Sequence, residues 1–86
     1  MFKYVAFAAN FDFSKAIFEN VADFKYAKFL NDGSFANVRF KNGSDFKYAA
    51  FSRSVNLKGA DFNGTNDFKY TTLDNEQTTV DELVNK

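Results

Sequence analysis

The side chains of this sequence that could do chemistry are carboxylates, amines, hydroxyls and phenols, because the chain contains no histidine and no cysteine. Nucleophile systems built on Cys–His or Ser–His–Asp are therefore excluded. Zinc is not expected either, since its usual protein ligands are sulfur and imidazole nitrogen. Carboxylates are plentiful, but their spacing does not predict a pair held apart in a pocket, as acid–base catalysis requires. We expect no catalytic residue, no metal, no cofactor and no enzymatic activity.

The most regular chemical pattern is a Phe-Lys-Tyr tripeptide that occurs four times at intervals of 22 residues. An aspartate precedes the last three copies, and stacking of successive turns of chain would align equivalent residues in columns. The lysine column is Lys3, Lys25, Lys47 and Lys69, and the aspartate column is Asp23, Asp45 and Asp67. Opposite charges in neighbouring columns offset the repulsion within each column. We interpret the two columns as a solvated surface, with an ion- or phosphate-binding stripe as the alternative.

A third column contains Tyr4, Tyr26, Tyr48 and Tyr70. Stacked aromatic rings on an exposed ridge can bind a partner, because aromatic side chains carry much of the binding energy in protein interfaces. The alternative is that the stacked rings only stabilise the successive turns of chain and bind no partner. These four tyrosines are the candidate partner surface.

The backbone that carries these columns must be regular. Its regularity is visible in the large apolar residues, which recur at alternating steps of five and six residues. Twelve of the 13 phenylalanines fall on this lattice, and only Phe11 does not. A small or β-branched residue lies two positions before every second lattice residue. Residues two apart share one face of a strand, whereas helical faces need spacings of three and four. The lattice therefore predicts short strands and argues against an 11-residue helical coiled coil. The lattice residues are Phe2, Phe7, Phe13, Phe18, Phe24, Phe29, Phe35, Phe40, Phe46, Phe51, Leu57, Phe62, Phe68 and Leu73.

These strands predict an all-β solenoid over residues 1–75, with four sides and 22 residues per coil. Coils stack at the strand spacing of about 4.8 Å, so that equivalent phenylalanines lie over one another. The aromatic residues then fill the interior and leave no room there for a substrate. One coil cannot bury its own ring of phenylalanines, so the fold should be cooperative only as a stack.

The stretches Ala22-Asp23-Phe24, Ala60-Asp61-Phe62 and Val55-Asn56-Leu57 resemble the small–polar–large register of the pentapeptide-repeat family. The resemblance covers residues 2–75 and implies a right-handed quadrilateral β-helix, in a bacterial and cytoplasmic protein. The usual family spacing is a constant five residues, whereas every second step here is six, as in a phenylalanine-rich variant with an 11-residue unit. We expect the added residue to bulge two opposite corners.

The C-terminal residues predict a short α-helical cap over residues 76–86. Thr79 and Glu82 fit a capping box, and Val80, Leu83 and Val84 would form one apolar stripe. The alternative is a frayed tail, because so short a helix is marginal without packing.

The N-terminal coil has no comparable cap, and Phe11 is expected to be exposed beside it. Phe2, Phe7 and Phe11 are therefore the candidate self-association edge. Two interpretations remain: the chain is a fragment of a longer solenoid, or the open coil pairs with a second copy. We expect a homodimer with a two-fold, end-to-end contact, because head-to-tail stacking would make a filament.

The sequence therefore favours a non-enzymatic structural or protein-interaction module that binds a protein partner or itself. Equal numbers of acidic and basic residues give no overall field to hold nucleic acid or an anionic membrane, and no apolar run could span a bilayer. The family resemblance suggests an alternative, a DNA mimic that binds gyrase and protects the topoisomerase. Such a mimic needs a strongly negative surface, whereas residues 1–73 carry ten basic and seven acidic side chains.

Overall fold

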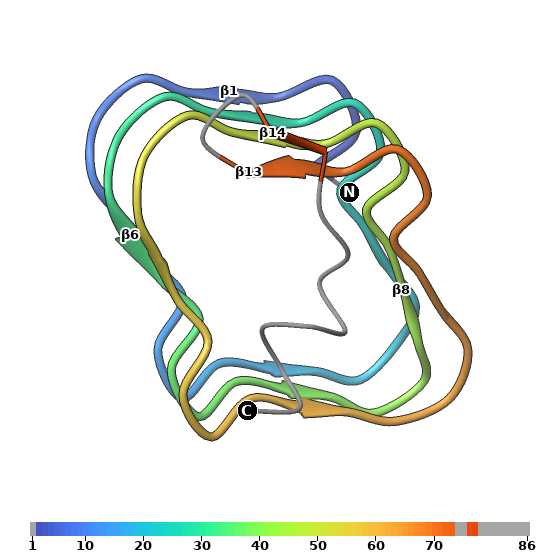
Figure 1. The fold of residues 1–86 in the computed structure, drawn as a ribbon. Helices are drawn as coiled ribbons and strands as arrows, with labels where there is room; N and C mark the ends of the chain where they lie inside the picture. The colour runs from blue at the N-terminus through green and yellow to red at the C-terminus, as the bar shows by residue number, and fades with distance from the viewer. Residues whose placement is uncertain (1, 74–75, 78–86) are drawn as a thin grey trace.

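The computed structural model of the chain describes residues 2–73 and 76–77, with side chains for residues 2–73. This part is an all-β solenoid of the right-handed type with about 22 residues per coil, and it contains no helix. Figure 1 shows the coils as nested four-sided outlines that follow the same path. We call residues 2–23 the first coil, residues 24–45 the second and residues 46–67 the third.

Each side of the solenoid is a sheet of two-residue strands that pair in parallel with the strand 22 positions away, except that the last strand of the first sheet pairs antiparallel. The first sheet contains β1 (Ala6–Phe7), β5 (Lys28–Phe29), β9 (Ala50–Phe51) and β13 (Thr72–Leu73), followed by β14 (Glu76–Gln77). The second contains β2 (Phe11–Asp12), β6 (Gly33–Ser34) and β10 (Val55–Asn56). The third contains β3 (Ile17–Phe18), β7 (Arg39–Phe40) and β11 (Asp61–Phe62). The fourth contains β4 (Ala22–Asp23), β8 (Ser44–Asp45) and β12 (Asn66–Asp67).

Two opposite corners of each coil are tight β-turns, and the other two are wider and rounded (Figure 1). In the first tight corner the N–H of Val5 donates to the carbonyl of Phe2 at 3.1 Å. Tyr4, the third residue of that turn, has a φ of 64°, as a type II turn requires. The residue added at every second step lies in the wide corners, between the first and second sheets and between the third and fourth. The equivalent third turn residues are Lys15, Tyr26, Asn37, Tyr48, Gly59 and Tyr70, all with positive φ.

The core consists of phenylalanine columns along the solenoid axis. Phe24 and Phe46 stack with ring centroids 4.8 Å apart, and Phe29 and Phe51 stack at 4.4 Å. Rings of different columns also meet edge to face, as Phe24 does with Phe35 and Phe40 with Phe46, which is a favoured arrangement of aromatic rings. The second-coil rings are fully buried, whereas the first-coil rings of Phe2, Phe7, Phe13 and Phe18 are only half-buried. The predicted solenoid, its coil length and its aromatic core are thus confirmed.

The expectation that Phe11 is exposed is wrong, because its side chain is only 8 % exposed. Gly33 occupies the equivalent position one coil later and leaves room for the ring. A Cβ atom at Gly33 would lie 2.0 Å from a ring carbon of Phe11. The large and the small residue thus share one interior site, and Phe11 belongs to the core.

The predicted C-terminal helix over residues 76–86 is not supported. Glu76–Gln77 form β14, which pairs antiparallel with β13. The chain therefore reverses after Leu73 and places a strand on the outer edge of the first sheet. Residues 78–86, which include the proposed helical stripe, lie outside the described residues.

Replacing Lys15 by glycine is expected to stabilise the fold. Lys15 has a φ of 63°, a conformation that costs a residue with a Cβ atom about 1 kcal/mol relative to glycine. Gly59 already occupies the same turn position two coils later. Urea unfolding should show a higher midpoint for Lys15→Gly. The matched control, Ser14→Gly, changes the preceding turn residue and should lower the midpoint, since that residue is not in the left-handed region.

Candidate functional site

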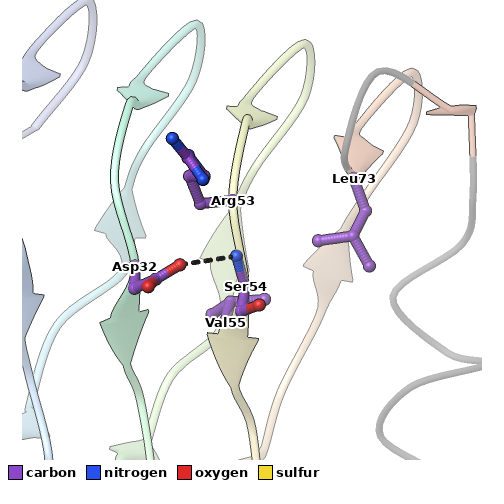
Figure 2. A pocket seen from close by; sticks show the side chains of 5 residues that line it. All are labelled: Asp32, Arg53, Ser54, Val55 and Leu73. Atoms are coloured by element: carbon purple, nitrogen blue, oxygen red, sulfur yellow. Dashed lines mark hydrogen bonds between the residues drawn. The ribbon is translucent and has the colours of Figure 1, made fainter.

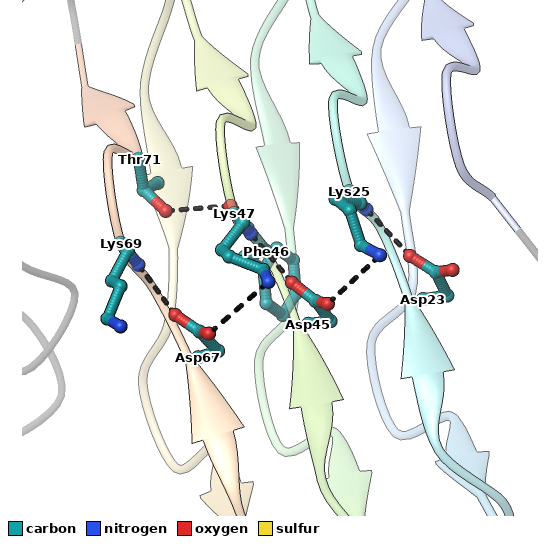
Figure 3. Close-up of polar contacts among 8 residues, drawn as sticks. All are labelled: Asp23, Lys25, Asp45, Phe46, Lys47, Asp67, Lys69 and Thr71. Carbon is teal, nitrogen blue, oxygen red and sulfur yellow. Dashed lines mark hydrogen bonds and ion pairs between the residues drawn. The ribbon is translucent and has the colours of Figure 1, made fainter.

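The aspartate column holds the tight corners together (Figure 3). Oδ1 of Asp23, Asp45 and Asp67 each accepts the backbone N–H of the lysine two residues later, at 3.0 Å. Asp12, Ser34 and Asn56 accept in the same way at the opposite corner. Hydrogen bonds from Ser14 also hold the pKa of the Asp12 carboxyl below its ordinary value, because they stabilise the ionised form. These side chains close turns, which is a common role for Asp, Asn and Ser.

The second aspartate oxygen faces the lysine that lies 20 positions earlier in the sequence, in the adjacent row of the corner. Lys25 Nζ lies 3.6 Å from Asp45 Oδ2, and Lys47 Nζ lies 3.8 Å from Asp67 Oδ2 (Figure 3). Both pairs are partly exposed, so each contributes little to stability. The two columns neutralise each other along the corner, which favours the solvated-surface interpretation over an anion-binding stripe.

Replacing Asp45 by alanine should destabilise the protein by about 1 kcal/mol, because the N–H of Lys47 loses its acceptor. Asp45→Asn keeps the acceptor oxygen, as Asn56 does in the equivalent turn, and should lose only a few tenths of a kcal/mol. Chemical unfolding of both variants distinguishes turn closure from ion pairing. Equal losses in the two variants would show that the ion pair, not the turn hydrogen bond, matters.

The tyrosine column forms an exposed ridge of stacked rings at one tight corner. Ring centroids are 5.0 Å apart between Tyr4 and Tyr26 and 4.9 Å apart in the two later pairs. Tyr4 is the most exposed, at 67 %, and Lys3 Nζ lies 5.3 Å from its ring centroid. The structure therefore brings together the four tyrosines that the sequence selected. Because the rings lie face to face, the ridge offers mainly ring edges and hydroxyl groups along its length.

The first coil carries a second cluster of apolar side chains that the sequence interpretation found only in part. Phe2 and Phe7 were expected at the open edge, and Phe13 and Phe18 join them as half-buried rings. Ile17 and Val21 add exposed apolar surface at 53 % and 57 %. Among the described residues, no strand pairs with the outer edge of the first coil. We call this surface the open edge.

The sequence indicates this cluster when the outward residues of the first coil are compared with the residues at equivalent positions of later coils. Ile17 of the first coil is replaced by Arg39 in the second coil and Asp61 in the third. Ala6 is replaced by Lys28, and Ala9 by Asn31. At these three positions the first-coil residue is more apolar than its second-coil equivalent, as expected for surface that is covered in an assembly, whereas exposed Leu30 replaces Ala8 and Ala50 is the third-coil equivalent of Ala6.

A cavity of about 520 Å³ lies beside Leu73, where the chain leaves the solenoid path (Figure 2). Asp32, Arg53, Ser54 and Val55 also line it, and the N–H of Ser54 donates to Asp32 Oδ1 at 3.1 Å. Among the described residues of the lining, the charged groups are one carboxylate and one guanidinium, which do not form the carboxylate pair of a general acid and base.

The described residues contain no cluster of three or more side chains that could hold a metal ion. None of their elements is a helix long and apolar enough to cross a membrane.

Comparison with known proteins gave one family match. Residues 2–50 match the family model described as pentapeptide repeats (9 copies). No match was found in the search of curated proteins or in the search of solved structures.

Proposed function

Because the chain belongs to the pentapeptide-repeat family, we propose that it is a non-enzymatic interaction module whose open edge binds the open edge of a second copy. The observation that carries this proposal is the apolar first coil. Its four lattice phenylalanines are half-buried, whereas the equivalent rings of the second coil are at most 1 % exposed. A second copy would complete the burial of these rings, each of which is already partly covered and would gain only part of the roughly 2 kcal/mol of full burial.

The opposite end of the solenoid is built differently. There β14 pairs antiparallel with β13 and covers the edge of the first sheet that a following coil would need. Head-to-tail stacking, which would extend a filament, is therefore obstructed on one side. A closed two-fold contact between two open edges leaves β14 in place.

Adding positive charge at the open edge should break this dimer. Ala9 and Val21 are exposed, and Ala9→Lys with Val21→Lys brings four lysines together across the contact. Like charges in close contact oppose association, so we expect the dimer dissociation constant to rise at least about tenfold. Light scattering over a range of protein concentrations measures the change.

The matched control places the same charges in later coils, as Asn31→Lys with Thr65→Lys, at the same two columns. This control should remain dimeric. A wild-type chain that is monomeric at high protein concentration would contradict the proposal. A double variant, Ala9→Lys with Val21→Lys, that dimerises with unchanged affinity would contradict it as well. Far-ultraviolet circular dichroism checks that all variants are folded.

The tyrosine column stays a candidate partner surface in this proposal. The DNA-mimic alternative finds less support, because residues 1–73 are basic rather than acidic. A gyrase supercoiling assay with and without the protein separates the two functions. We expect no protection of the enzyme from its inhibitors.

A further inference from the structure

We propose that Asn63 is a site of spontaneous chemical modification, at which the folded chain converts asparagine to aspartate and isoaspartate with water as the only co-reactant. The site lies in the wide corner between the third and fourth sheets (Figure 1). The inference is independent of the proposed self-association. It follows from the exposure and the hydrogen bonds of the glycines in these corners.

An asparagine that precedes glycine can react with its own backbone. The glycine nitrogen loses its proton and attacks the Cγ atom of the asparagine. A bond from this nitrogen to Cγ forms, the Cγ–Nδ2 bond breaks, and the Nδ2 group leaves as ammonia with the proton that the nitrogen lost. Water then opens the resulting succinimide ring at either carbonyl, which gives aspartate or isoaspartate. Glycine favours the reaction because it has no Cβ atom beside the attacking nitrogen.

The backbone hydrogen bonds select two of the three places where this ring could form. An asparagine or aspartate precedes glycine at Asp32-Gly33, Asn42-Gly43 and Asn63-Gly64. The N–H of Gly33 donates to the carbonyl of Ser54 at 3.1 Å, so its nitrogen is held in the ladder between coils. Within the described residues, the N–H groups of Gly43 and Gly64 make no hydrogen bond. Only the two asparagines therefore precede a nitrogen that the ladder leaves free.

The second-coil site is protected in two further ways. Nδ2 of Asn42 donates to the backbone carbonyl of Glu19, which ties the side-chain amide to the first coil. This bond must break before Cγ can approach the nitrogen of Gly43. Gly43 is also buried, and a Cβ atom at Gly64 would lie only 2.9 Å from its nitrogen. The third-coil backbone thus covers the group that would attack.

The third-coil site lacks both protections in the described part of the chain. Asn63 and Gly64 are exposed, and no described residue bonds the side-chain amide of Asn63. Nδ2 of Asn66 donates to the carbonyls of Asn63 and Gly64, at 3.3 and 3.2 Å, and leaves the N–H of Gly64 free. A donor on the Asn63 carbonyl also polarises the peptide that contains this N–H, which favours loss of its proton.

Aspartate at position 63 should be compatible with the fold. In the preceding coils the same column contains Glu19 and Lys41, whose side chains form an ion pair at 3.0 Å. A carboxylate at position 63 would continue this alternation of charge next to Lys41. We therefore expect Asn63→Asp to unfold at a urea concentration close to that of the wild type.

Isoaspartate should not be compatible with the fold, because it adds a carbon atom to the backbone between two ladder bonds. The N–H of Asn63 donates to the carbonyl of Phe40 at 3.0 Å. Two residues later, the carbonyl of Thr65 accepts the N–H of Ser44 at 3.1 Å. A longer backbone between these groups shifts one bond out of register, so the isoaspartyl chain should unfold at a lower urea concentration than Asn63→Asp.

The experiment follows both asparagines in one sample. Folded protein and protein unfolded in urea are incubated in mildly alkaline buffer, digested with trypsin and analysed by tandem mass spectrometry, with an unincubated digest as background. Trypsin separates the two sites, because Lys47 and Lys58 lie between them. In the folded chain, Asn63 should react at least about fivefold faster than Asn42, because the Asn42 side chain must first lose a hydrogen bond. In urea the two rates should be similar.

Two variants complete the test. Asn63→Gln should remove the product at this position, since the longer side chain closes a ring less readily, and Asn42→Gln should leave the rate at Asn63 unchanged. An Asn42 that reacts as fast as Asn63 in the folded chain would overturn the proposal. Product at both sites in urea but none at Asn63 in the folded chain would overturn it too. Equal urea midpoints for the isoaspartyl chain and Asn63→Asp would overturn its expected effect on the fold.

Discussion

Replacing Phe35 by alanine is expected to destabilise the protein by about 4 kcal/mol, enough to unfold much of a domain of this size. Phe35 is 1 % exposed and lies in the middle coil. Its ring stacks on Phe13 at 5.3 Å and meets Phe24, Phe29 and Phe46 edge to face. The large residues above, below and beside it are held by their own backbone hydrogen bonds, so they cannot collapse into the space that alanine would leave.

Two matched variants show whether burial is the cause. Phe35→Leu should cost only about 1.5 kcal/mol, because Leu57 fills the next position of the same column. Phe18→Ala, at a half-buried position of the open edge in another column, should cost less than Phe35→Ala. Urea unfolding followed by circular dichroism measures all three. A Phe35→Ala variant as stable as Phe18→Ala would show that the columns do not act as one core.

The solenoid could be predicted because its determinants are periodic. Phe24, Phe46 and the other lattice residues each specify one side of one coil, and the alternating five- and six-residue steps fix the coil length. The aspartates before the tight corners were recognised as a column, but their main role was not. Oδ1 of Asp45 closes a turn, which shows only when the backbone N–H of Lys47 is placed beside it.

Features that depend on a single pair of residues could not be predicted from the repeating pattern of the sequence. Phe11 breaks the lattice, and only its contact with Gly33 shows that the ring is buried. β14 follows from a chain reversal after Leu73, whereas the sequence pattern around Thr79 and Glu82 favoured a helix. Ile17 and Val21 do not stand out in the lattice, because the lattice contains inward residues, whereas the change from Ile17 to Arg39 and Asp61 concerns an outward position.

The contact between Phe11 and Gly33 predicts a strong dependence of one substitution on the other. Gly33→Val should cost about 3 kcal/mol or more, because its side chain would enter the space of the Phe11 ring. The φ of Gly33 is not in the left-handed region, so the cost comes from overlap and not from backbone strain. Phe11→Val alone should also destabilise, by about 2 kcal/mol, because it leaves a cavity over the glycine.

The double variant, Phe11→Val with Gly33→Val, should be close to the wild type in stability, since Val55 shows that valine fits the next position of the same column. The double-mutant cycle should therefore give a coupling of about 5 kcal/mol, above the usual range for residues in contact. Urea unfolding of the four proteins measures it. Additive losses would mean that Phe11 can leave the core without cost to its neighbours, which is how the chain would behave if this ring were available at the open edge. A large coupling would assign Phe11 to the interior and leave Phe2, Phe7, Phe13 and Phe18 as the rings that a second copy can cover.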